Sequence, residues 1–294
     1  MPIHIEAAAV VLLIAAFIHA YFYSPLLFWP LVSLTASSVV LAALSPLAIS
    51  RRMTFLAHAQ GHSILTAALA AAVPTAVVAQ SLSSPVFYLF TLLFVIMLNL
   101  FVLATERLGF KKDVATGVVM SFQLTAAVAL LYIVRALYAA TLDPLSLITG
   151  EYVLITWREV ALQMPLLLLS LLFPAVYGAK YLYAALDELF SEAAGIKVKA
   201  LDRLFIVSMS LAVSASVYAL GSLMPAVLLV LPGAVASRYS YRLTEQIPLS
   251  VAFAALSAGA SHFLYTALPW LWPSAALGVV MFAFLAIAPR AGAK

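Results

Sequence analysis

The stretch from Val86 to Ala104 reads VFYLFTLLFVIMLNLFVLA and contains no charged residue. About 20 consecutive apolar residues are enough for a helix to cross the hydrocarbon core of a bilayer, so this stretch predicts a transmembrane helix. Outward from it, apolar runs bounded by charges, Pro, Gly and Ser predict further spans on both sides. The predicted spans are residues 6–22, 26–49, 54–79, 86–104, 114–134, 160–184, 203–219, 223–237, 247–267 and 272–289.

The composition of the whole chain agrees with this interpretation. Of its 294 residues, 66% are hydrophobic and 9% are charged, with a mean hydropathy of +1.13. Soluble domains have about 25% charged residues, so this chain has too few charges to cover a surface in water. Ten spans also leave no room for an extramembrane domain of ordinary size. We therefore predict an all-α, polytopic membrane protein in which residues 1–294 form a single transmembrane domain, although Gly221 and Pro225 allow residues 203–237 to be divided differently.

The basic residues predict the orientation of the chain. If the N-terminus is inside, the outer side keeps Arg135 and Arg158, and all other Lys and Arg fall on the inner side. This asymmetry satisfies the positive-inside rule, so we expect both termini in the cytoplasm and the protein in the plasma or inner membrane. A signal peptide is the other interpretation of the first span, but no basic region precedes it, and Phe22-Tyr23-Ser24 is a poor cleavage site.

Several kinds of chemistry are excluded by missing residues and motifs. The chain contains no cysteine, which removes disulfides, thiolate metal sites and cysteine nucleophiles. It has no G-x-x-x-x-G-K-[ST] loop for nucleotide phosphates and no G-x-S-x-G nucleophile motif. Coupling to ATP would therefore need a partner chain, and we expect neither a nucleic-acid partner nor a permanently bound cofactor.

Two histidines near the start of the third predicted span are the strongest candidates for a metal site. His58 and His62 are four residues apart, so on a helix their rings share one face and can bind one ion. Position 59 is Ala, so the general base of an H-E-x-x-H zinc protease is missing. The alternative is that both are interfacial histidines bonded to backbone or water, although polar groups at membrane depth are generally functional.

His262 in the ninth predicted span is a third candidate. It is read either as a packed, hydrogen-bonded histidine or as a further ligand on the same path. At 1.5 Å per residue His62 lies about 12 Å from the inner edge and His262 about 20 to 24 Å. A shared site therefore needs a helix offset or a kink, and otherwise the histidines mark successive stations. His19, beside Tyr21, Phe22 and Tyr23, reads as an interface anchor.

The inner loop at about residues 186–200 predicts a short amphipathic helix that ends at Gly195. Acidic residues Asp187, Glu188 and Glu192 precede that glycine, and Lys197 and Lys199 follow it, an order that a helix dipole favours. The loop is either an ordinary solvated turn or a docking helix for a cytoplasmic partner.

Taken together, several segments resemble the permease subunit of zinc, manganese and iron ABC importers. Residues Arg51 to Leu56 match the family's Arg-Arg-Met-[Ser/Thr]-Phe-Leu element, and His62 falls on the family histidine that follows an Asp-Ala pair. Three later elements of the family are similar to Asp187 through Ile196, Gly221 through Arg238, and Pro273 through Ala276. The resemblance covers roughly residues 26 to 289.

The resemblance implies a fold, partners and a cargo. The fold is that of vitamin B12 and metal-chelate type permeases. The partners are ABC ATPase subunits docked on Asp187, Glu188, Glu192 and Gly195, an external substrate-binding protein facing Arg135 and Arg158, and a second copy of the permease in a homodimer. The cargo is a divalent metal ion. His58 stands where the family usually has Asp, and because imidazoles suit Zn²⁺ whereas Mn²⁺ favours oxygen, we expect Zn²⁺ rather than Mn²⁺. Mn²⁺ and Fe²⁺ are the alternative cargoes.

Three other functions remain open at this point. A permease for a siderophore or corrinoid chelate would need a wider path with fewer histidines. A membrane-embedded metalloenzyme would use the His58/His62 pair, but no acidic residue lies near that pair in the sequence. A passive channel would conduct ions without an ATPase.

Overall fold

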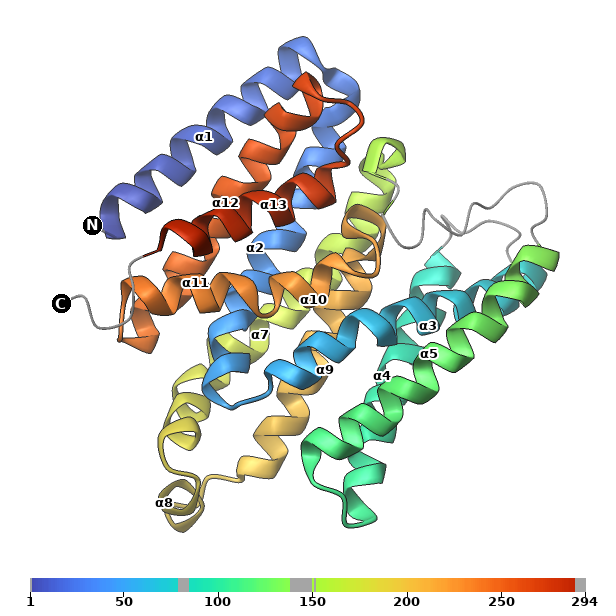
Figure 1. The fold of residues 1–294 in the computed structure, drawn as a ribbon, viewed down its shortest axis with the longest axis vertical. Coiled ribbons are helices and arrows are strands. Elements are labelled where there is room, and N and C mark those ends of the chain that lie inside the picture. Colours follow the sequence, from blue (N-terminus) through green and yellow to red (C-terminus); the bar gives the residue numbers. More distant parts are fainter. Residues whose placement is uncertain (1, 79–84, 138–149, 151, 289–294) are drawn as a thin grey trace.

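The fold is entirely helical within the residues that the structure describes. The computed structural model describes residues 2–78, 85–137, 150 and 152–288 (Figure 1). Its long helices are α1 (Pro2–Tyr23), α2 (Phe28–Ser50), α3 (Thr54–Val78), α4 (Pro85–Arg107), α5 (Lys112–Leu137), α7 (Trp157–Leu186), α9 (Val198–Leu220), α12 (Leu243–Ala267) and α13 (Pro273–Ile287). The shorter elements are η1 (Pro25–Leu27), η2 (Tyr152–Leu154), α8 (Glu188–Ala193), α10 (Met224–Leu228) and α11 (Leu231–Tyr239).

Eight helices in the described residues are long and apolar enough to cross a membrane. They correspond to eight of the predicted spans, and α7, α9 and α12 extend several residues beyond the predicted limits at their charged ends. The other two predicted spans fall on shorter apolar helical segments, Met224–Tyr239 and Pro273–Ile287. The prediction of an all-α polytopic membrane protein is therefore confirmed.

The prediction of one continuous span over residues 223–237 is wrong. The chain there forms α10 and α11, separated at Leu229 and Val230. Pro225 and Pro232 each stand in the first turn of one of these helices. Proline has no N–H to donate and is tolerated in a first turn, so these two prolines favour two short helices over a single long one.

The helices form two groups that meet at α9 and α10. In one group α12 packs against α1, α2, α11 and α13, and in the other α3 packs against α4 and α5 (Figure 1). Helix α9 contacts α2, α3, α4 and α7. Helices α2, α3, α9 and α12 are the most buried long helices, whereas α1, α5 and α7 are the least buried. Helices α1, α5 and α7 therefore form the outer wall of the bundle.

Helices α1 and α12 run parallel and in close contact. Ala9 packs against Ala252, and a Cβ added to Gly259 would lie 3.2 Å from Cγ of Leu12. Contacts that lie further along α1 also lie further along α12, so the two helices run in the same direction. Small residues allow this close approach, as is usual between membrane helices.

Candidate functional site

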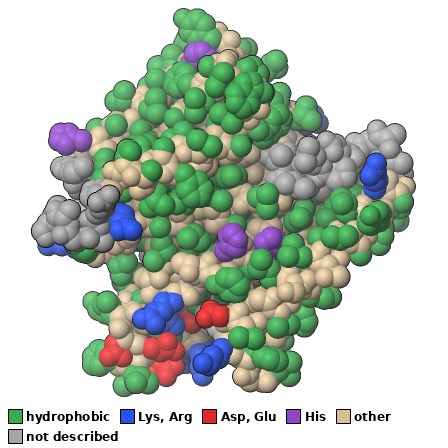
Figure 2. All heavy atoms as spheres, viewed as in Figure 1, with side chains coloured by type: hydrophobic (Ala, Val, Ile, Leu, Met, Phe, Trp, Pro, Cys, Tyr) green, Lys and Arg blue, Asp and Glu red, His purple; other side chains and the backbone are tan. Residues whose placement is uncertain are grey.

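His58 and His62 lie on one face of α3, close to its N-terminal end. Their ring centroids are 6.1 Å apart and the rings are at 72° to each other. His58 is exposed and His62 is half-buried. Figure 2 shows histidine side chains reaching the surface of the bundle amid hydrophobic side chains. The pair is therefore open on the surface of a single chain.

The remaining faces of α3 are fixed by packing and hydrogen bonds. A Cβ added to Gly61 would lie 3.0 Å from Cβ of Ala226, so α10 lies directly against the turn between the two histidines. On the buried side, Gln60 donates to Oδ1 of Asn99 at 2.9 Å, and Asn99 donates to Oγ of Ser210 at 2.6 Å. These contacts orient the helix so that His58 and His62 stay on its free face.

One chain offers only part of a metal site. No group of three or more His, Asp or Glu side chains that would suit a metal ion is found among the described residues. His58 and His62 thus bring two imidazoles and no carboxylate. Neutral imidazoles suit Zn²⁺ and other borderline ions better than Mn²⁺, Mg²⁺ or Ca²⁺.

His262 does not join the His58/His62 pair in one chain. Its Nε2 lies 3.1 Å from Nδ1 of His19 on α1, and the two ring centroids are 5.3 Å apart. The interpretation of His19 as an interface anchor missed this contact. Because α12 packs mainly on α1, α2, α11 and α13, the structure favours two separate pairs over one shared three-histidine site.

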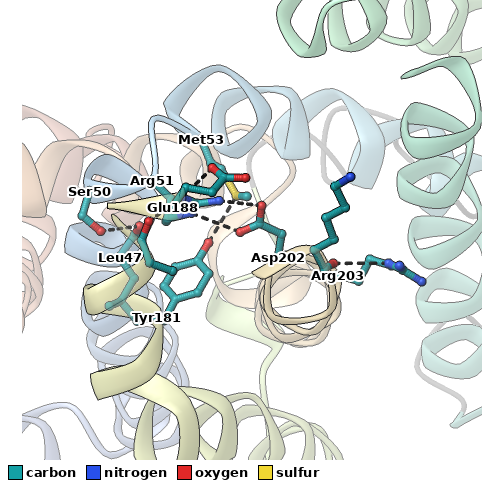
Figure 3. Close-up of polar contacts among 10 residues, drawn as sticks. Leu47, Ser50, Arg51, Met53, Tyr181, Glu188, Asp202 and Arg203 are labelled. Atoms are coloured by element: carbon teal, nitrogen blue, oxygen red, sulfur yellow. Dashed lines mark hydrogen bonds and ion pairs between the residues drawn. The ribbon is translucent and has the colours of Figure 1, made fainter. Parts of the chain in front are cut away.

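Arg51 joins the turn before α3 to the ends of three other helices (Figure 3). Its Nε and Nη2 donate to the two carboxylate oxygens of Asp202 in α9, at 3.2 and 2.9 Å. Its Nη1 donates to the carbonyl of Ala184 in α7 at 2.8 Å and to Glu188 in α8 at 3.2 Å. The guanidinium carbon also lies 5.9 Å from the ring centroid of Tyr181. We call Arg51, Asp202 and Glu188 the Arg51 cluster.

The Arg51 cluster is partly buried, with 10% of the Arg51 side chain exposed. Burial alone lowers the pKa of Arg51, but its hydrogen bonds to Asp202 and the charges of Asp202 and Glu188 hold that pKa above its ordinary value. The guanidinium therefore stays charged, and its planar donors match the carboxylate of Asp202 in two parallel bonds. The neighbouring Arg52 has a φ of +55°, which makes the turn between α2 and α3 sharp.

The predicted short helix of the inner loop is present as α8. Asp187 is its N-cap and accepts a hydrogen bond from the backbone N–H of Phe190 at 2.9 Å. Gly195 follows the helix with a φ of +83°, a conformation that favours glycine. Glu192 is exposed, while Glu188 bonds to Arg51. Three large apolar side chains of this segment are 71% or more exposed: Leu186, Leu189 and Phe190.

The two basic residues predicted for the other side of the membrane are both exposed. Arg135 lies in the last turn of α5. Arg158 lies in the first turn of α7, with its guanidinium 5.8 Å from the ring centroid of Trp157. Figure 2 shows acidic and basic side chains together at the lower end of the molecule, where α8 lies, and further basic side chains at its left edge.

Comparison with known proteins supports the interpretation of these elements. Residues 23–291 match the model of the ABC 3 transport family. The chain is 25% identical, over 209 residues, to a protein of Thermotoga maritima described as a "probable metal transport system membrane protein"; the match covers 71% of this chain and 70% of that protein.

Two solved structures have a similar fold. PsaBC from Streptococcus pneumoniae in complex with Fab has a TM-score of 0.78 at 19% identity, with 94% of this chain and 95% of that chain covered. A metal-chelate type ABC transporter in an inward-facing conformation has a TM-score of 0.68 at 14% identity, with 98% of both chains covered.

Proposed function

Because the chain belongs to the ABC 3 transport family and is a metal-type ABC transporter permease, we propose that its cargo is Zn²⁺ and that the ion moves into the cytoplasm. The observation that carries this proposal is the open His58/His62 pair on α3. An ion that leaves water needs ligands inside the bilayer, and polar side chains at that depth are costly unless they have such a role.

The proposed path runs between two copies of the chain. Zn²⁺ usually binds four ligands in a tetrahedral arrangement, whereas one chain supplies the two imidazoles of His58 and His62. A second copy related by a two-fold axis brings an identical pair, and the exposure of His58 on a single chain supports this arrangement. A site shared between two copies also releases its ion when the copies move apart, as transport requires.

ATP is hydrolysed by a separate subunit in this proposal, since the sequence contains no phosphate-binding loop. The docking surface is α8 with its flanking residues, where Leu186, Leu189 and Phe190 are exposed apolar contacts and Glu192 is an exposed charge. Arg51 lies in the turn before α3 and bonds to Glu188 in α8. From the first residue of α3, His58 lies about 6 Å further along the helix axis. Movement of the docked ATPase is thereby transmitted to the His58/His62 pair.

An external binding protein delivers the ion to the opposite side. Arg135 and Arg158 are exposed there and suit acidic residues of such a protein, which would steer its approach. In this proposal the chain has no catalytic residue and no permanent cofactor, and its metal is cargo.

Metal-stimulated ATP hydrolysis tests the proposal. The permease is purified with its ATPase, reconstituted in lipid nanodiscs and assayed with Zn²⁺ or Mn²⁺ in the presence of the binding protein. We expect Zn²⁺ to stimulate hydrolysis more than Mn²⁺ at equal concentration, and His62→Ala to lose that stimulation. His4→Ala is the matched control, because His4 is an exposed histidine near the N-terminus. An unchanged response of His62→Ala, or a stronger response to Mn²⁺, would contradict the proposal.

A second assay separates an ion from a metal chelate as cargo. Uptake of Zn²⁺ is compared with uptake of a ferric siderophore and of a corrinoid, in wild type and in the His58→Ala/His62→Ala variant. A chelate carries its own ligands and does not need imidazoles. Chelate uptake that the double substitution leaves intact, with no Zn²⁺ uptake by wild type, would replace the ion proposal by the chelate one.

A further inference from the structure

The His19–His262 pair lies at the end of the bundle opposite α8, near the C-terminal ends of α1 and α12 (Figure 1). We propose that these two histidines form a second site for a divalent transition-metal ion, separate from His58 and His62, and that Zn²⁺ is the ion it prefers. The role of this site as an entry station rests on the proposed function, whereas the binding of an ion at the site does not.

The distance between the two nitrogens suits a shared ion. Zn–N bonds of about 2.0 to 2.1 Å at a tetrahedral angle would place two ligand nitrogens about 3.3 Å apart. Nδ1 of His19 and Nε2 of His262 are 3.1 Å apart. These nitrogens share a hydrogen bond in the ion-free chain, so binding one ion would replace that bond and would turn both rings until their lone pairs point at the ion.

His262 is fully buried between the packed helices. Its side chain is 0% exposed, and in the ion-free chain its Nε2 shares a hydrogen bond with Nδ1 of His19. As a ligand, His262 would exchange that hydrogen bond for a bond to the ion through Nε2 and keep its proton on Nδ1, so the ring would have one defined tautomer.

The surroundings hold the two rings in place and favour a cation. His19 stacks on Tyr23 with centroids 5.5 Å apart, and Phe263 packs edge-on against both histidines. His19 is four residues from the end of α1 and His262 five from the end of α12. The C-terminal end of a helix carries a partial negative charge, and here two such ends lie together because α1 and α12 run parallel.

The two imidazoles predict which ion this site prefers and how readily it releases that ion. Two imidazoles without a carboxylate favour Zn²⁺ over Mn²⁺ and Ca²⁺. His19 is only half-buried, so an ion reaches the site from the outside, and the remaining coordination positions stay open to water or to a donor of the binding protein. Such a site binds weakly and releases its ion readily, as an entry station must.

The test uses a variant that keeps only these two histidines. The full chain has five histidines and no cysteine, so His4→Ala/His58→Ala/His62→Ala leaves His19 and His262. This background protein, purified without a histidine tag and placed in nanodiscs, is titrated with Co²⁺ and then with Zn²⁺. We expect one ion per chain, a visible absorption band of four-coordinate Co²⁺ that Zn²⁺ abolishes, and about a tenfold or greater loss of affinity on adding His19→Gln.

X-ray absorption at the zinc edge of the background protein reads the ligands without any substitution at the site itself. We expect scattering from two imidazoles per zinc. Absence of imidazole scattering, or binding that His19→Gln leaves unchanged, would overturn the proposal. Neither measurement involves transport, so a failure of the proposed zinc transport would leave this result interpretable.

Discussion

The two histidine pairs place the same residue type in opposite settings. His58 and His62 are one turn apart on a single helix and open to the surface, whereas His19 and His262 come from two helices and His262 is fully buried. Helix α3 begins three residues after Arg51, whose side chain contacts α7, α8 and α9. In the proposed function the first pair moves with the end of the molecule that carries α8, whereas the second pair lies between the packed helices α1 and α12.

The largest predicted difference between the pairs is in transport. The variant His58→Ala/His62→Ala is expected to lower Zn²⁺ uptake by about 100-fold or more, because even the loss of groups that merely support a metal ligand costs 10- to 100-fold. His19→Gln is expected to lower uptake only several-fold, since an entry station is bypassed at high ion concentration. Uptake of radioactive Zn²⁺ by vesicles that contain the whole transporter measures both. Equal losses in the two variants would remove the distinction.

Breaking the Arg51 cluster is expected to impair transport through the His58/His62 pair and to leave ion binding by the His19–His262 pair unchanged. Arg51→Ala leaves Asp202 partly buried without its partner, so we expect the free energy of unfolding to fall by about 3 kcal/mol and Zn²⁺ uptake to fall with it. Co²⁺ binding by His19 and His262, measured in the background that retains only these histidines, is expected to be unchanged.

A surface ion pair provides the control for Arg51. Arg242 and Glu245 are 3.4 Å apart, with 81% and 44% of their side chains exposed. Exposed pairs contribute little to stability, so Arg242→Ala is expected to leave the unfolding temperature and uptake nearly unchanged. An equal effect of the two substitutions would mean that Arg51 has no special role in linking α8 to α3.

One glycine near each pair allows the two sites to be disturbed separately. At Gly61 a Cβ would lie 3.0 Å from Cβ of Ala226 and 3.2 Å from the carbonyl oxygen of Ser222, whereas at Gly259 it would meet the Leu12 side chain at 3.2 Å. Gly61→Ala is therefore expected to cost about 1 to 3 kcal/mol and to lower uptake. Gly259→Ala is expected to have a smaller effect and to weaken Co²⁺ binding at His19 and His262. Thermal unfolding, uptake and Co²⁺ titration of both variants would show whether each glycine affects only its own pair.

The smallest predicted effect concerns the cap of α8. Asp187→Ala removes the hydrogen bond to Phe190 and is expected to destabilise this helix by about 1 kcal/mol, whereas Asp187→Asn keeps a capping oxygen. Affinity for the purified ATPase should fall several-fold in the first variant and little in the second. Identical affinities in both variants and in wild type would argue against α8 as the docking element.

Much of the fold was predictable because hydropathy is a local property. The eight helices that are long and apolar enough to cross a membrane follow from apolar runs, and α8 follows from Asp187 at its start and Gly195 after its end. The break between α10 and α11 was only partly predictable, since Pro225 and Pro232 mark it but the overall hydropathy there still resembles a span.

The contacts between helices were not predictable from the sequence. His19 and His262 are 243 residues apart, and Arg51 and Asp202 are 151 apart. In a chain that is apolar on nearly every face, the side that meets another helix and the side that meets lipid have similar residues. The sequence shows that His19 and His262 lie near the ends of two predicted spans. It does not show the packing of small residues, such as Ala9 and Gly259, that brings those two spans together.

The proposed cargo is Zn²⁺, and its proposed path passes the His58/His62 pair. The most direct measurement is uptake of radioactive Zn²⁺ and Mn²⁺, side by side and at equal concentration, by vesicles that contain the permease, its ATPase and its binding protein. We expect faster uptake of Zn²⁺ than of Mn²⁺ by wild type and no ATP-dependent Zn²⁺ uptake by His62→Ala. Preferred uptake of Mn²⁺, or undiminished Zn²⁺ uptake by His62→Ala, would contradict this proposal.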